Sequence, residues 1–145
     1  MKSASTPRRA RALAAADYER LADFRYLLRR FLAFSEAAAR GAGLTPRQHQ
    51  ALLAIKGHSA RKRMSIGELA EQLGLRHHSV VGLLDRLASR GLITRHASVA
   101  DRRQVLIELT REAEAALEDL SRAHRDELKR LAPLLRPLLE QFQKG

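Results

Sequence analysis

The sequence contains no cysteine and no tryptophan, and aromatic residues make up only 4% of its 145 positions. Without cysteine, disulfide bonds and thiol redox switches are excluded. No apolar run approaches the ~18 residues of a membrane-spanning helix, and the basic segment 1–20 lacks the apolar centre of a secretion signal. We therefore expect a cytoplasmic protein of one domain. Its alanine- and leucine-rich composition favours helices packed on helices.

The motifs of common enzyme sites are absent as well. The sequence has no glycine-rich phosphate loop, no nucleophile elbow and no metal-protease helix. His77 and His78 are neighbours, but side chains at successive helix positions point about 100° apart and cannot bind one ion together. The sequence therefore predicts no catalysis, no metal site and no cofactor.

Positive charge is plentiful and unevenly distributed. The net charge is +11, and residues 41–110 alone carry eleven basic and five acidic residues. Residues 1–16 carry four basic and no acidic residues, whereas residues 111–145 carry seven of each. A positive field confined to one part of a chain indicates a binding site for a polyanion. The basic segment 1–16 is interpreted as a flexible arm, either in contact with phosphates or simply solvated.

The central stretch 64–110 predicts two short helices followed by a β-hairpin. Apolar residues recur at helical spacing in two runs, each followed by a glycine. The runs are Ile66, Leu69, Ala70 and Leu73 before Gly74, and Val80, Leu83, Leu84 and Leu87 before Gly91. Two extended runs, 92–96 and 104–109, come next, and Met64–Ile66 suits a third strand beside them. Two helices joined by a tight turn form a helix-turn-helix unit, and the hairpin after it forms a wing.

The second helix carries the first group of candidate DNA-binding residues. Polar groups at the start of a recognition helix reach base edges in the major groove. The candidates on this helix are Arg76, His77, His78, Ser79, Gly82 and Arg86. Gly82 costs the helix about 1 kcal/mol relative to alanine. It indicates either a loosely packed surface helix or, as we prefer, close approach to DNA.

The remaining DNA-binding candidates lie outside that helix. Arg102 and Arg103 stand at the hairpin tip, where extended arginines can enter a narrow minor groove. Asp101 either holds the Arg103 side chain or serves ordinary turn chemistry. Arg95 on the hairpin and Ser65 complete the set, and Ser65 is also a candidate N-cap with Glu68 in a capping box.

Helices are expected on both sides of this module. Asp17 is predicted to cap a helix running to about Arg40, and Thr45-Pro46 to open another. Thr110 is predicted to cap a long last helix that breaks near Pro133. Both outer helices carry many leucines and phenylalanines, which favours a dimer interface. The expected organisation is a basic arm (1–16), a dimerisation helix (17–44), a winged helix-turn-helix (45–110) and C-terminal dimerisation helices (111–145).

Four segments together resemble the MarR family of winged-helix transcriptional regulators. They are GLTPRQHQALLAI (43–55), IGELAEQLGL (66–75), VVGLLDRLASRGLITR (80–95) and DRRQVLIELT (101–110). The resemblance implies a mainly α fold with a β-hairpin wing. It also implies a homodimer that binds a palindromic operator in double-stranded DNA, in most cases as a repressor. The alternative from the residues alone is an architectural DNA- or RNA-binding protein without sequence preference. A ~1,000-fold tighter binding of a palindromic duplex than of random duplex would exclude this alternative.

The same resemblance implies an effector site where the dimerisation helices meet the winged module. The residues expected there are Arg25, Leu28, His49 and Leu53, with Phe24 and Leu117 as further apolar walls. An apolar pocket with a few polar groups suits a small aromatic or phenolic ligand. The alternative is that these residues form an ordinary core between two parts of the chain.

Overall fold

The computed structural model describes residues 11–58 and 63–144. Most of the predicted arm 1–16 lies outside the described residues, as do the basic residues Arg61 and Lys62. The elements in chain order are α1 (Ala15–Gly41), α2 (Pro46–His58), β1 (Met64–Ser65), α3 (Ile66–Leu73), α4 (His77–Ser89), β2 (Ile93–Ala97), β3 (Val105–Leu109) and α5 (Arg111–Gln143). Among the described residues no helix is long and apolar enough to cross a membrane.

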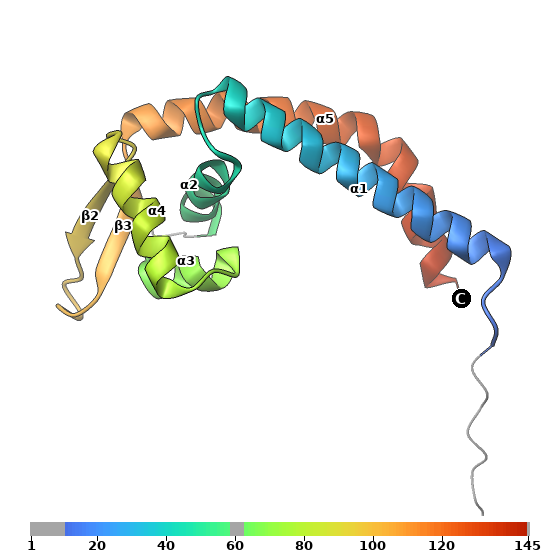
Figure 1. Ribbon diagram of the computed structural model, residues 1–145, viewed down its shortest axis with the longest axis horizontal. Helices are drawn as coiled ribbons and strands as arrows, with labels where there is room; N and C mark the ends of the chain where they lie inside the picture. The colour runs from blue at the N-terminus through green and yellow to red at the C-terminus, as the bar shows by residue number, and fades with distance from the viewer. Residues whose placement is uncertain (1–10, 59–62, 145) are drawn as a thin grey trace, which may run out of the picture.

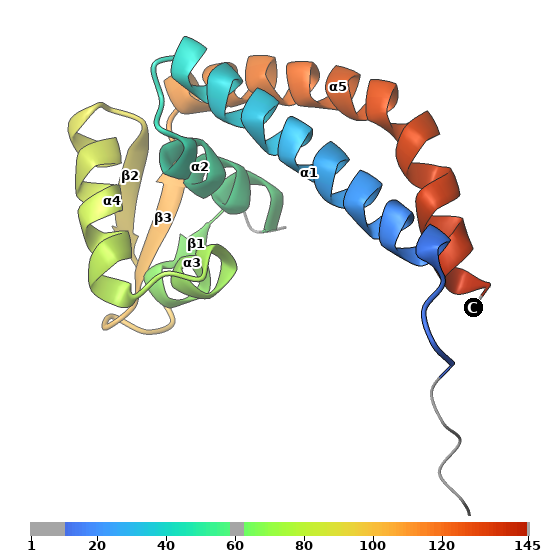
Figure 2. The same ribbon diagram turned by 45° about the vertical axis from the view of Figure 1, so that its right-hand side comes forward.

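The elements form a small winged-helix module with a long helical arm. In Figures 1 and 2, α2, α3, α4 and the strands lie together at one end of the molecule. The two longest helices, α1 and α5, lie side by side in both views and extend away from that module. The predicted fold class, mainly helical with a β-hairpin wing, is therefore confirmed.

The three strands form one antiparallel sheet with the order β1-β3-β2. Ile107 on β3 is the central position, because it is paired with Met64 on one side and Arg95 on the other. The short third strand predicted from Met64 is thus confirmed. It ties the start of α3 to the hairpin that follows α4.

A single apolar core joins the module to the long helices α1 and α5. The second predicted helix turns its apolar stripe inward, and Val80, Leu84 and Leu87 are fully buried. They belong to one cluster that also contains side chains of α2, β3 and the first turns of α5. Burying a side chain of this size contributes roughly 1.5–3 kcal/mol, so this core fixes which face of α4 remains available to solvent.

Local capping explains where three of the helices begin. The Thr45 hydroxyl accepts the Gln48 N–H (3.1 Å), while the Gln48 side chain accepts the Thr45 N–H (3.0 Å). Ser65 caps α3 through the N–H of Glu68 (3.1 Å), and Thr110 caps α5. All three caps were predicted. Gly74 and Gly91 end α3 and α4 with positive φ of 62° and 71°, a region that costs glycine little.

One predicted cap is wrong, and one pair of alternatives is decided, at the level of single hydrogen bonds. Asp17 is not the N-cap of α1: the helix begins at Ala15, and the Asp17 carboxylate accepts the N–H of Ala14 (2.9 Å). A carboxylate at the third helical position reaches back to the cap as well as a cap residue reaches forward. Asp101 does not hold the Arg103 side chain; its carboxylate accepts the Arg103 backbone N–H (3.0 Å). The turn interpretation holds there.

The predicted break near Pro133 is also wrong. α5 runs without interruption from Arg111 to Gln143, with Pro133 and Pro137 inside it, and Figure 2 shows it bending towards its C-terminal end. A proline inside a helix removes one hydrogen bond and clashes with the preceding turn, and bending relieves the clash. Packing retains the helix, because Leu134 and Leu138 line a groove together with Leu27 of α1.

Candidate nucleic-acid interface

The outer face of α4 offers a group of side chains without partners. Arg76, the N-cap residue, and the next two residues, His77 and His78, are exposed, as is Arg86 further along the helix. Within residues 11–58 and 63–144, none of these four side chains has a hydrogen bond or ion pair to another residue. Ser79 and Gly82 lie half-buried between them. Hydrogen-bonding side chains that have no partner within the fold remain available to a ligand.

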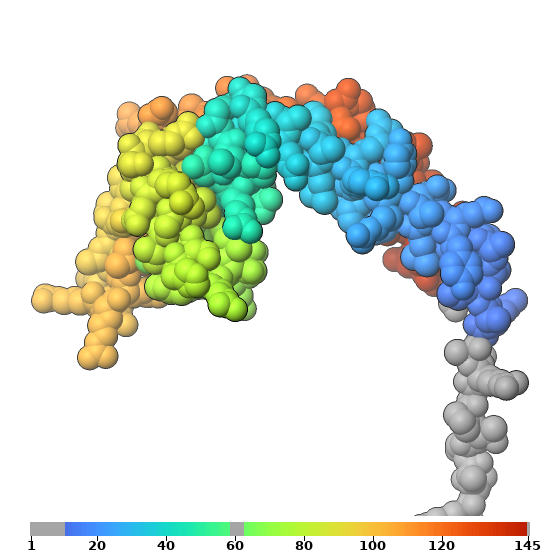
Figure 3. Space-filling view, viewed as in Figure 1, coloured from blue at the N-terminus to red at the C-terminus, as the bar shows by residue number. Residues whose placement is uncertain are grey.

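The wing presents two further arginines at its tip. The turn between β2 and β3 is held by local bonds, in which Ser98 N–H donates to the Gln104 carbonyl (2.9 Å) and Asp101 N–H donates to the Ser98 hydroxyl (3.3 Å). Arg102 and Arg103 are exposed on this turn. Figure 3 shows the hairpin tip protruding beyond the rest of the module. The turn therefore holds two cations away from the protein surface.

Two predicted DNA-binding residues have partners within the fold. The Arg95 guanidinium forms an ion pair with Asp85 (2.5 Å), which links β2 to α4. Ser65 is buried, and its hydroxyl both accepts the Glu68 N–H and donates to the Glu68 carboxylate (3.0 Å). Both side chains stabilise the frame around the candidate interface, and neither is free to reach a ligand without giving up that contact.

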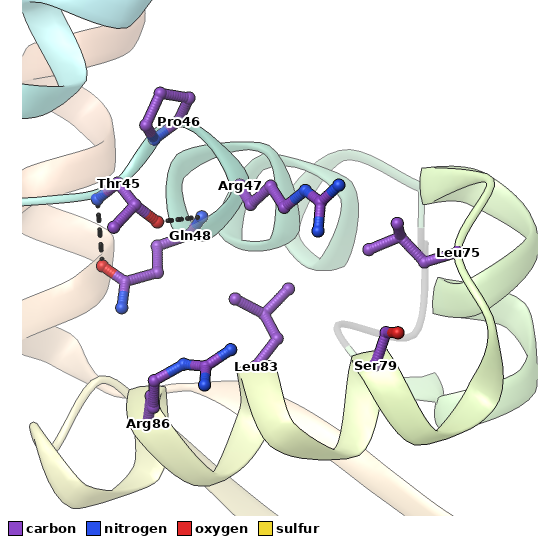
Figure 4. Close-up of a pocket in the computed structure, with 8 residues that line it drawn as sticks. All are labelled: Thr45, Pro46, Arg47, Gln48, Leu75, Ser79, Leu83 and Arg86. Carbon is purple, nitrogen blue, oxygen red and sulfur yellow. Dashed lines mark hydrogen bonds between the residues drawn. The ribbon is translucent and has the colours of Figure 1, made fainter.

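Arg47 is a candidate that sequence reasoning missed. It projects from the first turn of α2 into a cavity of about 480 Å³ between α2 and α4, which Figure 4 shows in close-up. Its neighbours across that cavity, Ser79 and Arg86, were predicted. One arginine at the start of a helix carries no signal in the sequence. Only the packing of α2 beside α4 places it there.

A second cavity, of about 500 Å³, lies where α1, α2 and α5 meet. His49 and Leu53, both predicted effector contacts, line it together with Phe31 of α1. The α5 residues that line it are Ser121, His124, Arg125, Leu128, Lys129 and Ala132. Of the other residues expected there, Arg25 and Leu28 are exposed on α1 and do not line the cavity, and Leu117 is part of the core. The basic residues of α5 were missed because they lie some seventy positions or more from His49.

Two histidines that line this second cavity, His49 and His124, contact each other with their rings tilted by 42°. Their ring centroids are 4.8 Å apart, and Phe31 and Phe34 pack edge-on against His124. His124 Nδ1–H donates to the Leu120 carbonyl (2.7 Å), since a carbonyl only accepts, and Nε2 is bonded to the Ser35 hydroxyl (2.7 Å). His49 is only 3% exposed. Burial, followed by the charge of His124, lowers the pKa of His49 from its usual 6.5.

Comparison with known proteins identifies the family of one domain. The MarR family model matches residues 42–104, which hold α2 to the hairpin. An uncharacterized HTH-type transcriptional regulator of Bacillus subtilis (strain 168), YfiV, is 33% identical over 90 residues, 62% of this chain and 54% of that protein. Residues 42–104 therefore form a MarR-family domain. The chain spans about half the length of the curated MarR-family relatives it matches, and those relatives are named as transcriptional regulators, not enzymes.

Solved MarR-family structures share the fold. A mutant of MarR from E. coli, complexed with operator DNA, superposes with a TM-score of 0.62 and 22% identity, covering 81% of this chain and 89% of that one. BpsR of Bordetella bronchiseptica, whose DNA binding is regulated by 6-hydroxynicotinic acid, has a TM-score of 0.60 and 21% identity over 83% and 90% of the two chains. At these identities the likeness establishes the fold.

Proposed function

We propose that this protein is a sequence-specific DNA-binding transcriptional regulator of the MarR family. The observation that carries the proposal is the unpartnered outer face of α4, with Arg76, His77 and His78 at its N-terminal end. That end of α4 and the tip of the β2–β3 hairpin lie at the same end of the module in Figures 1 and 2. A helix and a wing arranged in this way can read a major groove and the neighbouring minor groove of one duplex.

The regulator acts as a homodimer on a palindromic operator. Among residues 11–58 and 63–144, ten of the twelve exposed large apolar side chains lie on or beside α1 and on α5. They are Leu13, Tyr18, Leu21, Tyr26, Leu28 and Leu32, and Leu128, Leu134, Leu139 and Phe142. Exposed apolar area of this extent supports a protein–protein interface. Two-fold pairing through α1 and α5 would set two α4 helices about 34–36 Å apart, which is one turn of DNA.

A small aromatic anion releases the operator by binding the cavity between α1, α2 and α5. Phe31 and Leu53 supply apolar walls, and Arg125 and Lys129 supply positive charge. The His49 ring lines the cavity without a hydrogen bond to any residue in the described part of the chain, so it is available to a ligand. A ligand there touches both the winged-helix module and the long helices α1 and α5. It acts because its affinity differs between the dimer that binds DNA and the dimer that does not. Ligand-induced release is the behaviour of a repressor.

Selection of duplexes from a random-sequence library tests the proposed function. We expect the bound pool to converge on an inverted repeat whose half-sites are centred about 10–10.5 base pairs apart, or a multiple of that distance. A bound pool that stays as random as the starting library would instead support the architectural, sequence-independent alternative.

A further inference from the structure

The cavity between α2 and α4 joins two positive charges from different helices. Arg47 enters it from α2 and Arg86 from α4, with the Leu83 side chain between them and Ser79 beside them (Figure 4). No acidic residue among the described residues lines this cavity. Its volume of about 480 Å³ leaves room for a phosphate group.

These two arginines, like most arginines in the described part of the chain, have no carboxylate partner. Five arginines are paired with carboxylates: Arg20 with Asp17, Arg63 with Glu108, Arg95 with Asp85, Arg122 with Glu118, and Arg130 with Glu127. Neither Arg47 nor Arg86 has such a partner in residues 11–58 and 63–144. Two like charges facing one cavity repel each other, and an anion between them removes that repulsion.

The helix ends that carry the two side chains are fixed relative to each other. The first turn of α2 is closed by the reciprocal bonds between Thr45 and Gln48 (3.0 and 3.1 Å). Arg90, at the end of α4, donates to the Gly43 carbonyl (2.7 Å) and to the Gln48 side chain (3.2 Å). The start of α2 is therefore tied directly to the end of the recognition helix. The backbone of Arg47 therefore has a set place relative to α4 before any ligand binds.

We propose that Arg47 and Arg86 together bind one backbone phosphate of the operator, so that α2 is part of the DNA interface. The inference rests on the proposed function. A duplex whose major groove receives α4 carries phosphates along both borders of that groove, and Arg86 and Ser79 already line the cavity from α4. Guanidinium groups bind phosphate oxygens with paired, charge-assisted hydrogen bonds. Contacts of this kind position a protein on DNA without reading its sequence.

The test is the Arg47→Ala variant, measured against a duplex that the wild-type protein selects and against unselected duplex of equal length. Removing one cation that contacts the DNA backbone makes the plot of log affinity against log salt less steep by about 0.9. Extended from about 1 M to about 0.1 M salt, that slope corresponds to roughly an eightfold loss of affinity. We expect the same loss on both duplexes, because the contact carries no sequence information. Arg47→Lys, which keeps the charge, should retain the salt slope.

Arg29→Ala is the matched control, because Arg29 is exposed on α1 and its removal changes the net charge equally. It should leave affinity and slope unchanged. If Arg47→Ala binds like the wild type, or loses affinity only for the selected duplex, the phosphate site is rejected: in the first case Arg47 is idle, and in the second it contacts a base. If the wild-type protein itself prefers no duplex, the proposed function fails before the role of Arg47 is reached. Thermal unfolding confirms that each variant is folded.

Discussion

Replacing Arg103 with alanine separates the wing from the rest of the DNA interface. The turn that carries Arg103 is held by backbone groups, including the Arg103 N–H that donates to Asp101, and alanine keeps that bond. The side chain is exposed and bonded to no other residue of the described chain. The free energy of unfolding should therefore change by less than about 0.5 kcal/mol, so any effect on DNA binding belongs to the lost side chain.

The magnitude follows from the loss of one cation. If the Arg103 guanidinium lies against phosphates or in the minor groove, the salt slope falls by about 0.9, and affinity at about 0.1 M salt falls by roughly eightfold. Arg102 stands next to it on the same turn, so the double variant should lose about twice the slope. The wing and α4 contact different parts of the duplex, and their effects should add.

Fluorescence anisotropy of a labelled duplex at several salt concentrations measures both quantities. Arg29→Ala again controls for net charge, and light scattering checks that the oligomeric state is unchanged. An Arg103→Ala protein with wild-type affinity and wild-type slope would refute the reasoning, because an exposed and unpaired cation at the tip would then make no contact with DNA.

Three further predictions concern other parts of the molecule. His78→Ala should relax sequence preference at one position of each half-site by ~1–3 kcal/mol, measured with single-base variants of the selected duplex, and unchanged preference would remove His78 from the base contacts. Burial lowers the pKa of His49 below 6.5, so the unfolded chain binds a proton at this residue more readily than the folded chain. The free energy of unfolding should therefore be highest above pH 6.5 and fall as the pH drops below it. Urea titrations should show a smaller fall in His49→Gln and an unchanged one in His77→Gln. Millimolar benzoates or phenols should release the duplex, and Arg125→Gln should weaken that response without changing affinity in their absence; no release by any of them would contradict the ligand switch.

The parts of the fold that were predicted correctly depend on neighbouring residues. Thr45, Ser65 and Thr110 each cap a helix through a bond to the third residue on, a spacing that sequence displays directly. The apolar stripe of α4 is likewise local, because helical periodicity alone determines which residues share a face. The error at Pro133 has the opposite origin. Packing of α5 against α1 retains a helix that local propensity disfavours.

The candidate interface was only partly predictable for the same reason. The outer face of α4 and the hairpin tip are local features, so the sequence indicated Arg76, His78 and Arg103. Whether a cation has a partner depends on its neighbours in space, and the sequence did not show that Arg95 is paired with Asp85. Conversely, Arg47 was found only once α2 lay beside α4.

The second cavity follows the same rule. His49 and His124 lie far apart in the sequence, on α2 and α5, yet their ring centroids lie 4.8 Å apart. Helical spacing puts His124 on the same face of α5 as Leu120 and Leu131, but it cannot name the residue on another helix that His124 meets. Contacts between distant segments require the packing of whole helices, which no single window of sequence contains.

The most direct test of the central claim, that the face of α4 reads DNA sequence, is a competition measurement. A labelled duplex containing the selected inverted repeat is bound at about 0.15 M salt and displaced with unlabelled repeat or with unlabelled duplex of shuffled sequence. We predict that the shuffled duplex competes at least ~1,000-fold less effectively. Replacing Arg76, His78 and Ser79 together by alanine should remove most of this preference for the selected duplex, while the weak binding to shuffled duplex persists. Equal competition by the two duplexes would contradict the account.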